Sequence, residues 1–216
     1  MDHTRLFVIR HGETDYNFRG RLQGRNIDAP LNQTGQQQAE AIGEYLKLYQ
    51  IDKVVSSSLL RSRQTAELIQ QHFKLDLTVE PDLDEMDFGD FEGREYQSIK
   101  EQIGDVQQRW QSGDFDYPIP GGESPSQVFD RANRAARNQL DNHPGQNIVF
   151  IVHGRLIRIL LSNWLEIGLN NMQQIEHRNG SINQVVWDGN RFEPVYLNKT
   201  DHLGEEATIH PLYKNS

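Results

Sequence analysis

LFVIRHGET, residues 6–14, joins four consecutive apolar residues to two basic side chains and a glycine. An apolar run of this length, bounded by charge, is typical of a strand that is buried on both faces. Arg10, His11 and Gly12 stand where this strand would end. Because ligands bind at the carboxyl ends of the strands in an open parallel sheet, the stretch predicts that Arg10 and His11 reach a functional site.

Two further apolar runs, residues 54–57 and 147–152, have the same character, and a helical pattern follows each of the three runs. Strands that alternate with helices indicate a largely parallel sheet. Asp-Gly-Asn between two strand-like segments, over residues 181–197, is a strong β-hairpin signal. We therefore expect an α/β fold of three layers, α/β/α, with a mostly parallel central sheet and a C-terminal β-hairpin, in a single domain over residues 1–216. The expected helices are 34–50, 60–73, 95–111, 124–142 and 156–164.

Two of these helices begin with a recognisable capping box, in which two side chains satisfy backbone N–H groups of the first turn. Thr34 and Gln37 form the first box, and Ser124 and Gln127 form the second. Pro125 suits the first turn of the helix that follows Ser124. The polar segment from residue 198 onward is expected to be a tail.

The composition is that of an ordinary globular protein. A chain of 216 residues is long enough to bury roughly 70% of the surface that it exposes when unfolded. The absence of cysteine excludes disulfides, thiolate nucleophiles and cysteine-based zinc sites. A formal net charge of −9 argues against a nucleic-acid partner, because phosphate-backbone binding shows as a basic face. No apolar stretch has the length of a membrane span or a signal peptide, so we expect no membrane partner and a cytoplasmic location.

A second strand-like run also ends in a histidine and a glycine, because His153 and Gly154 follow residues 147–152. Arg61 lies a few residues beyond the run that ends at residue 57. If these strand ends meet, two guanidinium groups and two imidazoles surround one point. Guanidinium groups are permanently charged donors, and imidazoles change charge near neutral pH. Such a cluster suits a tetrahedral dianion, so it predicts a phosphoryl group as the ligand.

Five short motifs succeed one another along the chain. They are RHGET (10–14) with Asn17 and Gln23-Gly24 downstream, SSLLRSRQTAELI (57–69), LDEMDFGDFEG (83–93), PGGES (120–124) and VHG (152–154). In type and order these motifs resemble those of the histidine phosphatase superfamily, which has the phosphoglycerate mutase-like fold. The resemblance spans nearly the whole chain, and the set is far more specific than any single motif.

The resemblance implies a covalent mechanism in which His11 attacks phosphorus in line and water then hydrolyses the phosphohistidine. Such a route divides one difficult displacement into two easier ones. The attacking nitrogen must be unprotonated, so the other ring nitrogen should donate to a fixed acceptor. The resemblance implies that this acceptor is the backbone just after His11, where Gly12 permits a close turn. Arg10, Arg61 and His153 match the positions that hold the phosphate.

The residues expected at the mouth of the pocket are less strongly supported as substrate-binding residues. Asn17 and Gln23 match phosphate-contacting positions, and Gly24 and Gly154 are the other two residues expected to bind the substrate. From the residues alone, Asn17 and Gln23 are equally well explained as ordinary polar loop residues.

An alcohol leaves as a costly alkoxide unless an acid protonates it. The resemblance to the superfamily implies that Glu85 is this acid, because Glu85 matches the family's position in the pattern L-x-E-x-x-F-G-x-x-E-G; nothing else distinguishes it from the other carboxylates of the same acidic loop. Asp84 and Asp87 are the alternatives. No His-x-His or His-Glu-x-x-His spacing is present, so we expect no metal and no other cofactor. His177 and His202 stay open as residues that line the substrate pocket.

The preferred function is a phosphomonoesterase, a phosphoric monoester hydrolase that acts on a small phosphorylated metabolite such as phosphoserine or a sugar phosphate. Mutases of the superfamily typically have arginine, histidine and tyrosine after the acid, whereas Met86, Asp87 and Phe88 follow Glu85 here. A cofactor-dependent phosphoglycerate mutase remains one alternative, and an inactive phosphate-sensing or interaction protein is another. The sequence leaves a homodimer open.

Overall fold

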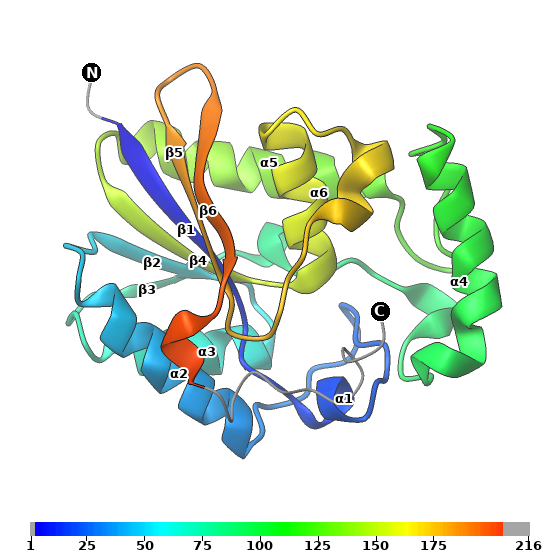
Figure 1. Ribbon diagram of the computed structural model, residues 1–216, viewed down its shortest axis with the longest axis horizontal. Helices are drawn as coiled ribbons and strands as arrows, with labels where there is room; N and C mark the ends of the chain where they lie inside the picture. The colour runs from blue at the N-terminus through cyan, green and yellow to red at the C-terminus, as the bar shows by residue number, and fades with distance from the viewer. Residues whose placement is uncertain (1–2, 205–216) are drawn as a thin grey trace.

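The computed structural model describes residues 3–204, in which six strands form one sheet in the order β3-β2-β4-β1-β5-β6 (Figure 1). Neighbours among the first four strands pair in parallel, whereas β5 pairs antiparallel with both β1 and β6. The predicted mostly parallel sheet with a C-terminal hairpin is therefore confirmed. The strands are β1 (Thr4–Arg10), β2 (Lys53–Ser56), β3 (Leu77–Val79), β4 (Asn147–Val152), β5 (Ile182–Trp187) and β6 (Phe192–Lys199).

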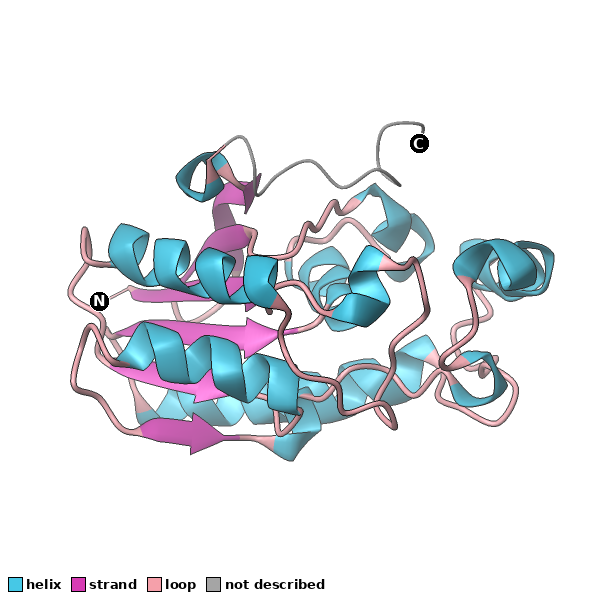
Figure 2. Cartoon of the chain, turned by 90° about the horizontal axis from the view of Figure 1, so that it is seen from below, coloured by secondary structure: helices cyan, strands magenta, loops and turns pink. Residues whose placement is uncertain are grey.

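Helices cover both faces of this sheet, as Figure 2 shows. Alternate side chains of β1 point to opposite faces, so Leu6 and Val8 pack against α5 and α6 while Phe7 and Ile9 pack against α2 and α3. All four are fully buried, which is why β1 is a continuous apolar run. The helices are α1 (Asp15–Phe18), α2 (Gln33–Leu46), α3 (Leu60–Gln70), α4 (Tyr96–Gln111), α5 (Pro125–Asn142) and α6 (Gly154–Trp164), with 3-10 turns η1 (Pro81–Leu83), η2 (Gly89–Phe91), η3 (Leu169–Gln174) and η4 (Asp201–Leu203).

One of the two predicted capping boxes is present. The Ser124 backbone N–H donates to Gln127 Oε1 at 2.9 Å, and the Gln127 backbone N–H donates to Ser124 Oγ at 3.3 Å. The box predicted at Thr34 is wrong, because the N-cap of α2 lies two residues earlier. Asn32 is its N-cap, and the Asn32 side chain accepts from the Gly35 backbone N–H at 2.8 Å.

The predicted tail begins too early. Residues 198 and 199 belong to β6, where Ile182 of β5 pairs with Lys199 and the Asn198 backbone N–H donates to Asn183 Oδ1 at 2.8 Å. Leu203 in η4 is buried as well. The polar residues of this segment therefore take part in the hairpin through their backbone, and the expectation for residues 205–216 lies outside the described part of the chain.

The topology places several strand ends side by side. β4 lies between β1 and β2, with Arg10 paired to Val152 and Ser56 paired to Ile151. The residues that come after these pairs leave the same edge of the sheet together. Among the helices of residues 3–204, none combines the length and the hydropathy that crossing a membrane would need.

Candidate active site

The ends of β1 and β4 bring two imidazoles together. The ring centroids of His11 and His153 lie 5.1 Å apart, with 55° between the ring planes. Both side chains are buried. The two histidines thus share one site, as their positions in the sequence predict, and the cause is the in-register parallel pairing of their strands.

Hydrogen bonds assign the tautomer of His11. Its Nδ1 lies 2.7 Å from the backbone oxygen of Gly12, and a carbonyl only accepts, so Nδ1 carries the proton. Nε2 therefore keeps its lone pair and accepts a hydrogen bond from Arg61 Nε at 3.3 Å. Burial, reinforced by the nearby charges of Arg61 and Arg10, holds the pKa of His11 well below its usual value. The ring is a neutral base whose free nitrogen faces a guanidinium group.

Gly12 is required here by packing. A Cβ at this position would collide with the backbone of Gly35 at the start of α2. The Gly12 backbone N–H donates to Thr65 Oγ1 of α3 at 3.1 Å. The loop after His11 is thus held against two helices, which orients the Gly12 carbonyl that fixes the ring.

Arg61, at the start of α3, is completely buried. Its Nε donates to His11, and its terminal nitrogens donate to the carbonyls of Ile27 at 2.8 Å and Gly24 at 3.2 Å. These bonds use three of the five N–H groups, which leaves two for a ligand. Burial lowers the pKa of Arg61 to about 10, so the side chain is still cationic at neutral pH.

His153 is held by two serines. Its Nε2 lies 2.6 Å from Ser57 Oγ and 3.3 Å from Ser62 Oγ. Burial, followed by the charge of Arg61, holds the pKa of His153 well below its usual value, so the ring is neutral. If a serine hydroxyl donates to Nε2, the proton of His153 sits on Nδ1, ready to be donated.

Three nitrogens of Arg10, Gln23 and His153 are buried and have no hydrogen-bond partner within residues 3–204. They are His153 Nδ1, Arg10 Nε and Gln23 Nε2. Buried polar groups almost always have partners, so these nitrogens are available to an acceptor that the protein itself does not supply. Gln23 is oriented by its other amide atom, since Oε1 accepts from Thr14 Oγ1 at 2.8 Å. An anion with several oxygens fits this set of donors.

Glu85 lies at the first turn of α6. Its Oε1 accepts from the backbone N–H groups of Met86 at 2.9 Å and Leu156 at 3.1 Å, and its Oε2 accepts from the Arg155 backbone N–H at 3.0 Å. Glu85 also interacts electrostatically with Arg61. Because α6 begins directly after His153, the same helix positions this carboxylate and the second imidazole.

The two alternative acids are engaged elsewhere. Asp84 accepts from the Ser58 backbone N–H at 2.8 Å and forms an ion pair with Arg25 at 3.5 Å. Asp87 accepts from Asn26 Nδ2 at 2.9 Å. Their carboxylates hold loops together, which leaves Glu85 as the acid of this loop that is anchored beside His153.

The sequence model of the histidine phosphatase superfamily (branch 1) matches residues 6–200. The chain belongs to this superfamily. A curated relative in Citrobacter koseri, "Probable phosphoglycerate mutase GpmB", is 34% identical over 180 residues, which is 83% of this chain and 83% of the relative.

Two solved structures are similar to this histidine phosphatase superfamily member. A mycobacterial glucosyl-3-phosphoglycerate phosphatase in complex with VO3 is 29% identical, with a TM-score of 0.82 over 91% of this chain and 99% of that one. A variant phosphoserine phosphatase from Entamoeba histolytica, in complex with phosphoserine, is 25% identical, with a TM-score of 0.82 over 93% of this chain and 100% of that one.

Three other predicted residues of this superfamily member, Asn17, Gly24 and Gly154, contact the residues around the cluster in different ways. Asn17 completes the capping box of α1, because its Oδ1 accepts from the backbone N–H of the N-cap residue Thr14 at 3.2 Å. Its Oδ1 also accepts from Asn179 Nδ2 at 3.0 Å, which ties it to the loop around His11. Gly24 contributes its carbonyl to Arg61. At Gly154, a Cβ would come within 2.7 Å of the His177 ring, so this glycine makes room for His177 beside the cluster.

His177 and His202 lie in different places relative to the cluster. The backbone oxygen of His177 accepts from Arg10 Nη1 at 3.3 Å, so His177 borders the cluster. His202 Nε2 lies 3.0 Å from the carbonyl of Gly180, and its ring lies 5.4 Å from that of Tyr45 on α2. None of the described contacts of His202 is with the cluster.

Sequence reasoning missed the residues that support the site. Ser57 had a usable signal, because it opens the motif that contains Arg61. Arg131 had none. It lies on α5, pairs with Glu123 at 2.8 Å and donates to the carbonyls of Asp82, Asp84 and Glu85, so it fixes the backbone that presents the acid.

Ser57→Ala is expected to lower kcat/KM about tenfold, because the tautomer of His153 loses its main anchor and Ser62, at 3.3 Å, replaces it poorly. Steady-state kinetics with p-nitrophenyl phosphate measures the loss. Ser56→Ala is the matched control, since Ser56 Oγ donates to the Ser57 carbonyl and makes no described contact with His153. Equal effects of the two changes would contradict the proposed orientation of the ring.

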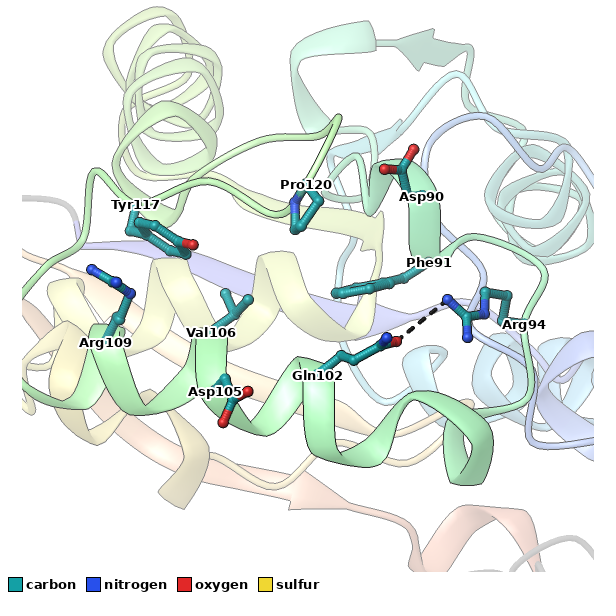
Figure 3. Close-up of a pocket in the computed structure, with 9 residues that line it drawn as sticks. All are labelled: Asp90, Phe91, Arg94, Gln102, Asp105, Val106, Arg109, Tyr117 and Pro120. Atoms are coloured by element: carbon teal, nitrogen blue, oxygen red, sulfur yellow. Dashed lines mark hydrogen bonds between the residues drawn. The ribbon is translucent and has the colours of Figure 1, made fainter.

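A separate hollow of about 410 Å³ lies between α4 and the loop that contains η2 (Figure 3). Arg94 and Arg109 line it together with Asp90 and Asp105, so its charges balance. Arg94 donates to Gln102 and Arg109 stacks on Tyr117, and both cations therefore have partners. This hollow is unlike the cationic cluster. Within residues 3–204, no three histidine or carboxylate side chains are placed to hold a metal ion together.

Proposed function

We propose that this protein is a phosphomonoesterase that transfers the phosphoryl group of a small phosphorylated metabolite to His11 and then to water. The observation that supports this proposal best is the tautomer of His11. Nδ1 donates to the Gly12 carbonyl, so Nε2 presents a lone pair between buried cations. A neutral imidazole held beside guanidinium groups is suited to attack a phosphate dianion.

In the first step His11 Nε2 attacks phosphorus, a nitrogen–phosphorus bond forms, and the bond between phosphorus and the ester oxygen breaks. Protonated Glu85 gives its proton to that oxygen, which leaves as the alcohol. The charge of the phosphoryl oxygens is stabilised by Arg10, Arg61 and the Nδ1 proton of His153. In the second step water attacks phosphorus, Glu85 takes a proton from it, and His11 is released with inorganic phosphate. The two steps need no metal or other cofactor.

Hydrolysis is preferred over mutase activity because of the side chains that come after the acid. Met86 and Phe88 are buried in the hydrophobic core, and neither can hold a substrate carboxylate. The two similar solved structures, from mycobacteria and Entamoeba histolytica, are both phosphatases. The relative named as a phosphoglycerate mutase keeps mutase activity as the second candidate. Phosphoserine and sugar phosphates are the substrates to examine first.

The proposal predicts release of inorganic phosphate from p-nitrophenyl phosphate in the presence of a metal chelator. A panel of phosphoserine, 3-phosphoglycerate and sugar phosphates then ranks natural esters by kcat/KM. A parallel assay supplies 3-phosphoglycerate with a bisphosphorylated primer and looks for 2-phosphoglycerate. Faster isomerisation than phosphate release would favour the mutase, and no turnover of any ester would favour a phosphate-sensing protein.

A further inference from the structure

Arg155 is a buried cation that the proposed chemistry does not use. It comes directly after Gly154 in the first turn of α6, and only 9% of the residue is exposed. Its guanidinium forms no hydrogen bond or ion pair with another described residue, and Nη1 is fully buried without a partner. Burial lowers the pKa of Arg155, and the charge of Glu85 opposes this effect. Desolvating a cation without an ion-pair partner is costly, so this arrangement calls for an external anion.

Arg131 shows what a structural arginine looks like in the same region. It is as buried as Arg155, but its guanidinium forms an ion pair with Glu123 and donates to three backbone carbonyls. Arg158, one turn after Arg155 on α6, donates to the Ile175 carbonyl at 2.9 Å and to Gln173 Oε1. Among these three arginines, only Arg155 lacks polar partners within residues 3–204.

The position of Arg155 relates it to the leaving group. Its backbone N–H donates to Glu85, the proposed acid. The Arg155 side chain therefore leaves the backbone next to the group that would protonate the leaving oxygen. The guanidinium carbon lies 5.5 Å from the ring centre of Trp110 on α4. Figure 1 shows α6 between the sheet and α4. Arg155 thus starts beside the acid, and its guanidinium group lies next to Trp110 of α4.

We propose that Arg155 binds a carboxylate on the alcohol half of the substrate, so that the enzyme prefers acidic phosphomonoesters to neutral ones. This inference rests on the proposed phosphomonoesterase function. A guanidinium group supplies paired donors in the planar geometry that a carboxylate accepts. The aromatic face of Trp110 limits the movement of the cation without neutralising it. The phosphoryl group occupies the Arg10 and Arg61 cluster, and the carboxylate occupies the Arg155 position.

The test uses two esters that differ at one carbon. 3-Phosphoglycerate has a carboxylate where sn-glycerol 3-phosphate has a hydroxymethyl group. The wild-type enzyme is expected to favour 3-phosphoglycerate by about 10- to 100-fold in kcat/KM, the scale of a charged hydrogen bond. Arg155→Met is expected to bring this ratio close to one, and Arg155→Lys to retain part of it. Because both esters are assayed in one preparation, the ratio does not depend on the folded fraction.

Arg158→Met is the matched control and is expected to keep the wild-type ratio, since the Arg158 guanidinium already has protein partners. A wild-type ratio near one, or a ratio that Arg155→Met leaves intact, would overturn the inference. Calorimetric binding of the same two esters to the His11→Ala variant, with and without Arg155→Met, separates this result from the proposed function. If the wild-type enzyme hydrolyses no ester but binding to the His11→Ala variant still shows an Arg155-dependent preference, the phosphomonoesterase is rejected and the carboxylate site is kept. Equal binding of the two esters would reject the carboxylate site.

Discussion

His11→Ala is expected to lower turnover of p-nitrophenyl phosphate by roughly 10⁴-fold or more, which is the scale on which enzymes lose activity when a covalent nucleophile is removed. The remaining cations would still bind phosphate, but no group in the cluster could form the covalent intermediate. His153 cannot replace it, because its Nε2 is bonded to Ser57. Stopped assays with purified variant and wild-type enzyme measure the loss.

The covalent intermediate of the proposed mechanism can be detected directly. Wild-type enzyme mixed with a radiolabelled phosphate ester and quenched rapidly should hold an acid-labile label, and His11→Ala should hold none. His153→Ala serves as the comparison, since it weakens stabilisation of the phosphoryl oxygens but leaves the nucleophile in place. We expect it to accumulate label slowly. Label on the His11→Ala variant, or turnover within tenfold of wild type, would show that another residue attacks phosphorus.

The two imidazoles keep their neutral state for a common reason. Both rings are buried beside Arg61 and Arg10, and a protonated imidazole there would face desolvation and like charge together. The permanent charge in the site therefore resides on guanidinium groups, which lose their protons only at high pH. In the proposed mechanism, this division leaves His11 able to attack phosphorus while the arginines stabilise the charge of the phosphoryl group.

The meeting of His11 and His153 could be predicted because each comes after an apolar run that is typical of a buried strand. Parallel strands end at one edge, so polar residues after two such runs have a good chance of sharing a site. The sequence pattern of apolar runs does not predict the order of the strands in the sheet. β4 lies between β1 and β2, and this order decides that Ser57 reaches His153.

Other features depend on contacts that no local pattern encodes. Strand β3 has three residues, partly exposed, and gives no periodic signal. Asn32 and Thr34 are both good cap residues, and only the bond from the Gly35 N–H to Asn32 decides where α2 begins. The isolation of Arg155 is likewise visible only in three dimensions, since it consists in the lack of any described residue that accepts a hydrogen bond from its guanidinium group.

Glu85→Gln is expected to lower kcat/KM for an alkyl ester such as phosphoserine by roughly 10²- to 10⁴-fold, which is the usual contribution of a general acid. The same change should cost at most about tenfold with p-nitrophenyl phosphate, because its phenolate leaves without a proton. A glutamine side chain keeps the size of Glu85 and one acceptor oxygen, but it has no proton to give. The measurement is the ratio of the two losses, which cancels any difference in the folded fraction of the variant.

Two neighbouring carboxylates provide the controls for this assignment. Asp84→Asn weakens the bonds to Ser58 and Arg25, and Asp87→Asn weakens the bond to Asn26, so both should lower the activity on the two esters by similar factors. A selective loss on the alkyl ester in either variant would move the role of acid to that residue. Equal losses on both esters in Glu85→Gln would mean that Glu85 only anchors the first turn of α6. The acid assignment therefore depends on leaving-group selectivity at Glu85 that is absent at Asp84 and Asp87.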